Sequence, residues 1–196
     1  MRPDTVTYCN CMEEVKQRIG LVKSVLVGLV TTGQEAFNIE LIFVQLRKTL
    51  ELIAFASLTA NKAKYCAAHA NFALHWRAKD MLEALGKINP GFYPVPLESP
   101  VRQGDAIVHF PRSEGGFLTK DEFAALYDVS SEIIHARNPF STKDSVTQIG
   151  YSVDQWVLRI QKLLRWHLTH LVDGDKWIVN ISEDGPIYLY PGGPIS

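Results

Sequence analysis

Polar side chains suited to phosphate chemistry gather two thirds of the way along the chain, and they are Glu132, His135, Arg137 and Asn138. An imidazole transfers protons near neutral pH, and a guanidinium binds phosphate oxygens through a planar fork of donors. Helical spacing also places Asp128 and Glu132 on the face of His135, where a carboxylate would fix the tautomer of the ring. The group predicts either a site that holds a phosphate or activates a hydroxyl, or a helix C-terminus at which His and Arg stabilise the helix dipole.

A second candidate group lies within residues 165–170, which hold one arginine and two histidines. On a helical wheel His167 and His170 continue an apolar series, so both imidazoles are expected beside the core, where such rings are usually hydrogen-bonded internally. Arg165 and His170 are five residues apart and point about 140° away from each other at roughly 100° per residue. They are expected to meet only across a dimer or at a break in the helix.

Three cysteines, Cys9, Cys11 and Cys66, do not have the pattern of a metal site. Cys9 and Cys11 form a lone Cys-x-Cys without two further ligands at metal spacing. An odd number of cysteines is typical of reduced thiols in a cytoplasm. No apolar run is long enough to span a membrane, and the N-terminus lacks the pattern of an export signal. We therefore expect a cytoplasmic protein that uses no metal, no cofactor and no membrane.

Charge is distributed unevenly along the chain, although the net charge is only −1. Residues 41–79 hold six Lys or Arg and one Glu, whereas residues 80–132 hold four Lys or Arg and nine Asp or Glu. Two interpretations fit this pattern: helices that pair these charges across their solvated faces, or a basic face that holds phosphates. The candidate residues of the basic face are Arg47, Lys48, Arg77 and Lys79. Arg47 also precedes Glu51 by four residues, a spacing that favours an ion pair within a helix.

The elements that must position these groups are mostly helical. Apolar residues recur at intervals of three and four through most of the chain, which is typical of helices packed lengthwise. The pattern predicts five helices, over about residues 8–29, 34–60, 67–85, 119–137 and 152–172. Asp4 or Asn10 is expected to cap the first helix, and Thr119 with Glu122 is expected to form a capping box at the fourth.

Two segments fall outside the predicted helices. Residues 89–116 hold five prolines and are expected to form a long irregular crossover, in which the apolar run 106–110 is a candidate strand. Residues 175–191 alternate with period two around a turn, which predicts a C-terminal β-hairpin. Because an isolated hairpin is marginal in water, it must pack on the helices, recruit the run 106–110 or pair with a second subunit.

Together these elements predict one domain over residues 1–196. Its expected fold class is mainly α, a four- to five-helix bundle over residues 1–172 with a C-terminal β-hairpin. The segment near the C-terminus is rich in aromatic residues, with Trp177, Tyr188 and Tyr190. Aromatic residues are favoured at protein interfaces. We therefore expect a homodimer.

Two short motifs carry a resemblance to a known family. Residues 46–53 (LRKTLELI) lie in the predicted central helix, and a later helix closes on residues 133–138 (IIHARN). With the helical layout, these motifs resemble the HEPN-like superfamily of small helical bundles over about residues 35–172. The resemblance implies a dimer, and it implies either an RNA-cutting toxin of prokaryotic defence or an inactive relative of one.

The catalytic motif of that superfamily is an Arg, usually followed by a polar residue, with a His about four to six residues on. Arg137-Asn138 has the expected start but no such His, and Arg165 to His170 has the spacing but a Trp after the Arg. The resemblance implies that His135 or His170 acts as acid and base while Arg137 or Arg165 stabilises phosphate charge. Two functions stay open: a bacterial HEPN-like protein that binds or cleaves RNA, or a noncatalytic, dimeric interaction module that acts through residues 89–116 and the hairpin.

Overall fold

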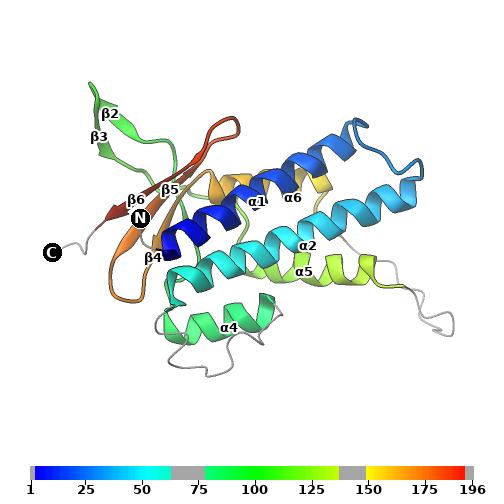
Figure 1. Ribbon diagram of the computed structural model, residues 1–196, viewed down its shortest axis with the longest axis horizontal. Helices are drawn as coiled ribbons and strands as arrows, with labels where there is room; N and C mark the ends of the chain where they lie inside the picture. Colours follow the sequence, from blue (N-terminus) through cyan, green and yellow to red (C-terminus); the bar gives the residue numbers. More distant parts are fainter. Residues whose placement is uncertain (1–2, 63–77, 137–148, 193–196) are drawn as a thin grey trace.

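The computed structural model of the protein describes residues 3–62, 78–136 and 149–192. The helices in these ranges are α1 (Pro3–Leu26), α2 (Glu35–Ala60), α4 (Ala78–Ile88), α5 (Lys120–Ile134) and α6 (Val153–Leu164). The strands there are β1 (Val95–Pro96), β2 (Val101–Gln103), β3 (Ala106–His109), β4 (Trp166–His170), β5 (Lys176–Ile181) and β6 (Ile187–Gly192). The helices gather on one side of the sheet that holds β4, β5 and β6, and the β2–β3 hairpin projects away from the body (Figure 1).

The expected fold class, a mainly α bundle with one hairpin, is wrong, because the described chain is a mixed α/β protein. Strands β1, β4, β5 and β6 form one antiparallel sheet in that order, and β2 and β3 form a second sheet. The main error lies at residues 166–172, which were expected to end a helix. Helix α6 stops at Leu164, and the chain continues as β4 with alternate residues buried. Pairing with β5 along the whole of β4 outweighs the local helical spacing.

The predicted C-terminal hairpin is confirmed as β5 and β6, with Ile181 opposite Ile187 beside the turn. Its partner strand is β4 and not the run 106–110, and both of its strands contact α1. Strand β1 pairs on the other side of β4, with Val95 opposite Leu168. Strands β1 and β6 are therefore the two edges of the four-stranded sheet.

The candidate strand of the crossover is confirmed as β3, which pairs with β2. Gly104 adopts a φ of 60° in the turn between them, a conformation that glycine takes without steric cost. Every residue of β2 and β3 is exposed, including Val101, Ile107 and Val108. Residues 101–109, called the arm below, therefore bury no apolar side chain within the described chain.

Helix α2 occupies the centre of the helical layer. Helix α1 lies antiparallel along it, α5 lies along another side, and α4 lies near its C-terminal end (Figure 1). The predicted inward residues of α1 and α2 are buried over most of their length: Tyr8, Met12, Val15, Ile19, Val22, Ile42, Leu46, Leu50 and Ile53. In α4 the predicted residues Ala78, Met81 and Leu85 are buried, while residues 67–77 of that predicted helix lie outside the described residues.

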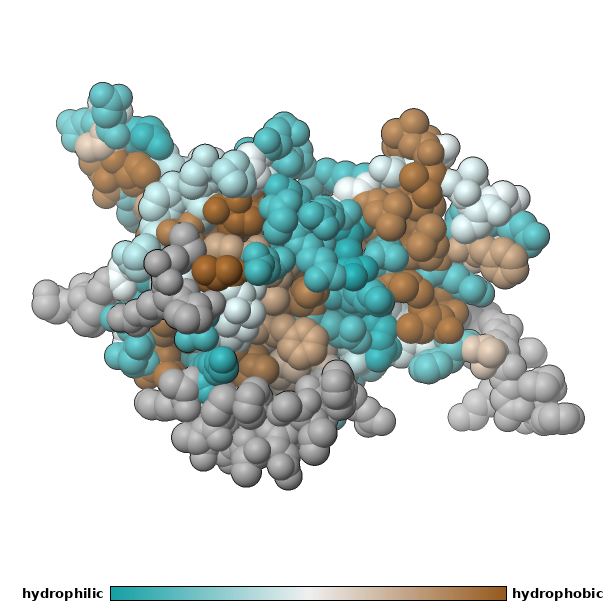
Figure 2. All heavy atoms as spheres, viewed as in Figure 1, coloured by the Kyte–Doolittle hydropathy of each residue, from teal (hydrophilic) through white to brown (hydrophobic). Residues whose placement is uncertain are grey.

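The ends of α1 differ from the prediction. The helix begins at Pro3, so neither Asp4 nor Asn10 is its N-cap. It ends at Leu26, and Leu29 of the predicted inward series is 81% exposed. The α1–α2 connection presents a group of exposed apolar side chains, which are Leu26, Val27, Leu29, Val30, Phe37 and Ile39 (Figure 2). None of the helices in the described part of the chain is long and apolar enough to cross a membrane.

Two capping boxes fix the starts of α5 and α6. The predicted box at Thr119 is confirmed: its hydroxyl accepts a hydrogen bond from the Glu122 backbone N–H, and the Glu122 carboxylate accepts one from the Thr119 N–H. Ser152 and Gln155 form the same pair of bonds at α6. The Glu122 carboxylate also binds the guanidinium of Arg159 in α6. The start of α5 is thereby tied to α6, which leads directly into β4.

Candidate functional site

The first predicted group is only partly visible at the end of α5. His135 is the exposed C-cap of the helix, and its backbone N–H donates to the carbonyl of Ser131. Asp128, expected to face His135, instead forms an ion pair with Lys79 of α4 at 2.7 Å. Glu132 is exposed, and Arg137 and Asn138 lie outside the described residues. Within the described chain no carboxylate is bonded to the imidazole of His135.

Arg47 of the predicted basic face joins α2 to α5. Its guanidinium donates to Glu51 at 3.2 Å, to the hydroxyl of Tyr127 at 2.8 Å and to the hydroxyl of Ser131. It also lies 4.3 Å from the centre of the Tyr127 ring, within cation–π distance. All of these partners come from α2 and α5, so the side chain of Arg47 fixes the packing of these two helices.

The other predicted members of the basic face do not form a continuous surface in the described residues. Lys79 is paired with Asp128, Lys48 is exposed, and Arg77 lies outside the described residues. Lys79 lies in the basic part of the chain and Asp128 in the acidic part, so this pair links the two across α4 and α5. The interpretation that the two charge blocks pair with each other thus fits the Lys79–Asp128 pair, whereas Arg47 pairs with Glu51 of its own block.

Arg165 and His170, the second predicted pair, lie at opposite ends of β4. Five residue steps of about 3.3 Å put their Cα atoms roughly 16 Å apart. His170 is half-buried, and its pKa is lowered by burial and by the nearby charges of Lys176 and Arg112. Within one chain these two side chains therefore do not converge on a single phosphate.

His167 is completely buried, as the sequence predicted, but it lies on the inner face of the sheet and not on a helix. Its Nδ1 lies 2.8 Å from the carbonyl oxygen of Leu164, which can only accept, so Nδ1 carries the proton and Nε2 is the acceptor. The Tyr8 hydroxyl then donates to Nε2 at 2.7 Å and accepts from the hydroxyl of Thr169 at 3.0 Å. This chain of hydrogen bonds satisfies the buried polar atoms and connects α1 to β4.

The surroundings of this buried group fix its charge state. Burial lowers the pKa of His167 to about 4, with the hydrogen bond to the Leu164 carbonyl acting in the opposite direction. Burial also raises the pKa of the Tyr8 hydroxyl well above its usual value. Both groups are therefore neutral at physiological pH. A neutral, fully bonded and buried histidine is a structural group and not an accessible proton donor.

A cleft with a volume of about 1020 Å³ is bounded by α1, by α6 and by the ends of the sheet strands. Arg165 and Trp166 line it where α6 passes into β4, and Asn180 lines it from β5. The backbone of Arg165 is held on both sides: its N–H donates to Gln161, and its carbonyl accepts from the backbone of Ile181 and from the Asn180 side chain. The ring of Trp166 packs against Phe110 with centroids 5.3 Å apart.

Most charges in the cleft are paired within it or at its rim. Lys23 binds Glu183 at 2.9 Å, and Lys162 lies 3.9 Å from Glu98. Hydrogen bonds from Lys23 and Gln161 lower the pKa of Glu183. The Arg165 guanidinium, in contrast, is exposed and forms no hydrogen bond or ion pair with the described residues. The charge of Arg165 also contributes to the lowered pKa of Glu183, but among the described residues its donors stay open to a ligand.

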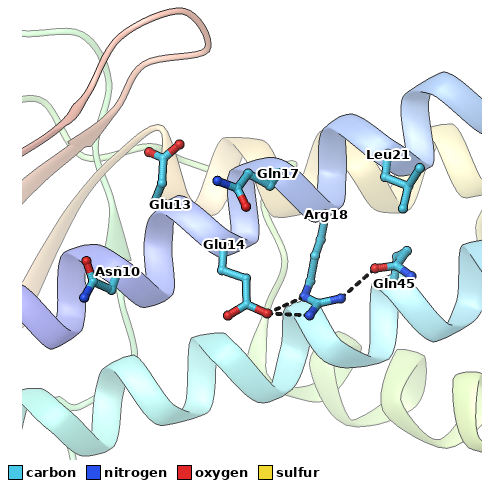
Figure 3. A pocket seen from close by; sticks show the side chains of 7 residues that line it. All are labelled: Asn10, Glu13, Glu14, Gln17, Arg18, Leu21 and Gln45. Carbon is cyan, nitrogen blue, oxygen red and sulfur yellow. Dashed lines mark hydrogen bonds and ion pairs between the residues drawn. The ribbon is translucent and has the colours of Figure 1, made fainter.

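A smaller pocket of about 460 Å³ lies between α1 and α2 (Figure 3). The guanidinium of Arg18 binds Glu14 in the same helix and donates to Gln45 of α2 at 2.7 Å. The remaining polar lining residues include Glu13, whose carboxylate binds Lys16 at 2.9 Å. The only lining arginine is therefore already paired, and two carboxylates flank it. This pocket is a poorer place for an anion than the cleft at Arg165.

The described residues contain no group of three or more metal-ligating side chains. Cys9 and Cys11 are both free thiols in α1. Burial raises the pKa of Cys11 to about 11 and raises that of Cys9, so both stay protonated at neutral pH. A protonated thiol is neither a good metal ligand nor a good nucleophile.

Sequence reasoning missed the residues that meet around Arg165. Asn180, Gln161 and Lys162 carry no motif, and they come together only because β4 pairs with β5 beside α6. The alternation of Trp166, Leu168 and His170 with His167 and Thr169 was a signal of a strand that the helical interpretation overlooked. Comparison with protein-family models, curated proteins and solved structures finds no match to this chain.

Proposed function

We propose that this chain is a cytoplasmic, HEPN-like protein that binds RNA at the cleft beside α6, with Arg165 as a phosphate contact. The observation that carries this proposal is an unpaired guanidinium next to an indole ring in a cleft of about 1020 Å³. Guanidinium groups bind phosphate through paired donors, and aromatic rings stack on bases. The volume suits a nucleotide, because pockets for small ligands usually measure about 300 to 1,000 Å³.

The packing of the two family-like motifs supports the HEPN-like part of the proposal. Arg47 in residues 46–53 binds Ser131, which lies one helical turn before His135 in residues 133–138. The two motifs thus come from α2 and α5, which lie side by side in the helical layer (Figure 1). The sheet is an addition that the family resemblance does not explain.

We expect Arg165 and His170 to bind RNA without cleaving it. A general acid must lie within hydrogen-bond reach of the atom that it protonates, and the guanidinium must reach the same phosphate. Arg165 and His170 are separated by the length of β4, and His167 between them is buried and neutral. The two accessible side chains can contact different phosphates of one RNA strand.

Fluorescence anisotropy of a labelled single-stranded RNA of twelve uridines tests the proposal. Arg165→Ala should weaken binding about tenfold and reduce the slope of log K against log salt by about 0.7, since one phosphate contact is lost. Arg102→Ala in the arm removes the same charge outside the cleft and is the matched control. No binding by the unmodified protein, or equal effects of both variants, would overturn the proposal.

Gel analysis of the same RNA after incubation tests the absence of cleavage. The RNA should stay intact with the unmodified protein and with His135→Ala and His170→Ala. Loss of full-length RNA that His135→Ala or His170→Ala abolishes would assign a nuclease instead. Cleavage unchanged by both variants would point to a contaminating enzyme, and repurification should then remove it.

The arm supports a second candidate function, a noncatalytic interaction module that works as a homodimer. Val101, Ile107 and Val108 are exposed on a two-stranded hairpin, which is marginal in water unless its apolar side chains are covered. In this candidate function the arm, which lies within residues 89–116, forms part of a contact between subunits. Sedimentation at tens of micromolar should then give twice the 22.0 kDa mass of one chain, and Val108→Asp should shift it to the single-chain mass.

A further inference from the structure

The outer face of the four-stranded sheet carries side chains that do not pack into the core, although the Trp166 ring contacts Phe110 and the Asn180 side chain bonds to the Arg165 carbonyl. Strand pairing aligns them in two rows: Trp166, Asn180 and Tyr188 in one, and Leu168, Ile178 and Tyr190 in the other. Residues paired across antiparallel strands share one face of the sheet. We call these six residues the stacking face.

The two tyrosines of the stacking face are open to solvent. Tyr188 is 48% exposed and Tyr190 is 47% exposed. Their rings are nearly parallel, with centroids 6.4 Å apart and an angle of 18° between the planes. Helices cover only the opposite face of this sheet (Figure 1), where His167, Thr169, Trp177 and Val179 are buried. Each tyrosine therefore leaves part of its aromatic surface open to solvent.

The charge of this sheet favours an anionic partner. None of the four strands contains Asp or Glu within the described residues, whereas His170 and Lys176 lie opposite each other at one end. Arg112 is close enough to affect the titration of His170. Lys176 and Arg112 thus supply positive charge near that end of the stacking face, and Arg165 lies at the other end of β4.

The stacking face is continuous with the cleft at Arg165. Trp166 and Asn180 belong to the first row of the face and also line the cleft. These two residues thus connect the stacking face to Arg165, with the Trp166 ring also in contact with Phe110. Aromatic rings next to cations are the usual means by which proteins hold single-stranded nucleic acid, since every base has a π face.

We infer that the outer face of the sheet binds a single-stranded segment of RNA, whose bases stack on Tyr188 and Tyr190 while its phosphates contact Lys176 and Arg165. This inference rests on the proposed function and names the form of RNA that the site takes. Bases in a duplex are stacked on each other and paired, so they are not available to these rings. The absence of carboxylates from the strands also distinguishes this face from one that suits a basic protein surface.

Paired tyrosine variants test the inference against single-stranded and double-stranded RNA. The double variant Tyr188→Ala/Tyr190→Ala should weaken binding of a twelve-uridine RNA at least about tenfold, because stacking on both rings is lost. The double variant Tyr188→Phe/Tyr190→Phe keeps both rings and should bind within about threefold of the unmodified protein. Binding of a twelve-base-pair RNA duplex should be weak and equal in all three proteins.

Controls separate the stacking face from general effects. Val27→Ala/Leu29→Ala removes two exposed apolar side chains at the α1–α2 connection and should leave RNA binding unchanged. Thermal unfolding of each variant should stay within a few degrees of the unmodified protein, since the changed residues are exposed. Sedimentation of the same samples records whether the tyrosine variants change the oligomeric state.

The outcomes distinguish this inference from the proposed function. RNA binding that depends on Arg165 but is unchanged in Tyr188→Ala/Tyr190→Ala would overturn the stacking face alone. No binding of any RNA by the unmodified protein would overturn both. A lower sedimentation mass of the alanine variant with unchanged RNA affinity would assign the tyrosines to contact between subunits, and that result also overturns the inference.

Discussion

On the inner face of the four-stranded sheet, Tyr8, His167 and Thr169 are buried and bonded to one another, whereas on the outer face Tyr188 and Tyr190 leave about half of their surface in solvent. Strand β4 contributes to both faces, since His167 and Thr169 point inward and Trp166, Leu168 and His170 point outward. Residues next to each other in sequence therefore have separate roles. Inward substitutions should change stability, and outward ones should change ligand binding.

The largest expected effect on stability is at Trp177 on the inner face. Its ring packs edge-on against Tyr8, with centroids 5.5 Å apart. Trp177→Ala should lower the free energy of unfolding by about 4 kcal/mol, because a large buried ring leaves a cavity. Tyr190→Ala, also on the C-terminal hairpin but on the outer face, should lower it by less than about 1 kcal/mol. Urea unfolding measures both, and similar losses would mean that the two faces do not differ in packing.

The next effect is a loss of stability in acid caused by His167. Its pKa is about 4 in the folded protein and 6.5 ordinarily, so below pH 6.5 the unfolded chain binds a proton that the folded chain excludes. The contribution of neutral His167 to the free energy of unfolding is present in full above about pH 6.5, and it is lost as the pH drops toward 4. The expected loss between pH 7 and pH 5 is about 2 kcal/mol.

Urea unfolding at pH 7, 6 and 5 measures this loss. A His167→Gln variant should lose less stability than the unmodified protein over the same range, which isolates the histidine from other titrating groups. The imidazole resonances of His167 should also stay constant between pH 7 and pH 5. Titration of that ring with a midpoint near 6.5 would contradict the burial of His167.

The smallest of the three losses of stability is expected when the Tyr8 hydroxyl is removed. Tyr8→Phe keeps the ring but leaves His167 Nε2 and the Thr169 hydroxyl without their shared partner, so it should cost about 1 to 2 kcal/mol. Tyr188→Phe removes an exposed hydroxyl and should change the free energy of unfolding by less than about 0.5 kcal/mol. An equal effect of the two substitutions would contradict the difference between the faces.

Local signals allowed several elements to be predicted from the sequence. The capping box at Thr119, the long apolar series of α2 and the period of two in β5 are each contained within one segment. Burial of His167 was also predicted, although on a helix. These features depend on neighbours along the chain, and tertiary contacts reinforce them here.

Strand β4 and the cleft were not predicted, for a physical reason. The spacing of His167 and His170 fits a helix, and the alternation of the same residues fits a strand, so local pattern does not decide between them. Pairing of β4 with both β1 and β5 decides it, and β1 is a two-residue strand that is distant in sequence. The sequence named Arg165 as a candidate site residue. The exposure of its side chain follows only from the pairing of β4 with β1 and β5.

Arg165 is the single residue between α6 and β4, and this position affects how tightly it is expected to bind a phosphate. Because the Arg165 backbone is bonded to Gln161 in the helix and to Ile181 in the sheet, it is ordered before any ligand arrives. A phosphate that binds there restricts only the side-chain torsions, which costs about 0.5 to 1.5 kcal/mol, and orders no loop. The junction is thus preorganised, and association with it is expected to be rapid and to proceed without a conformational change of the chain.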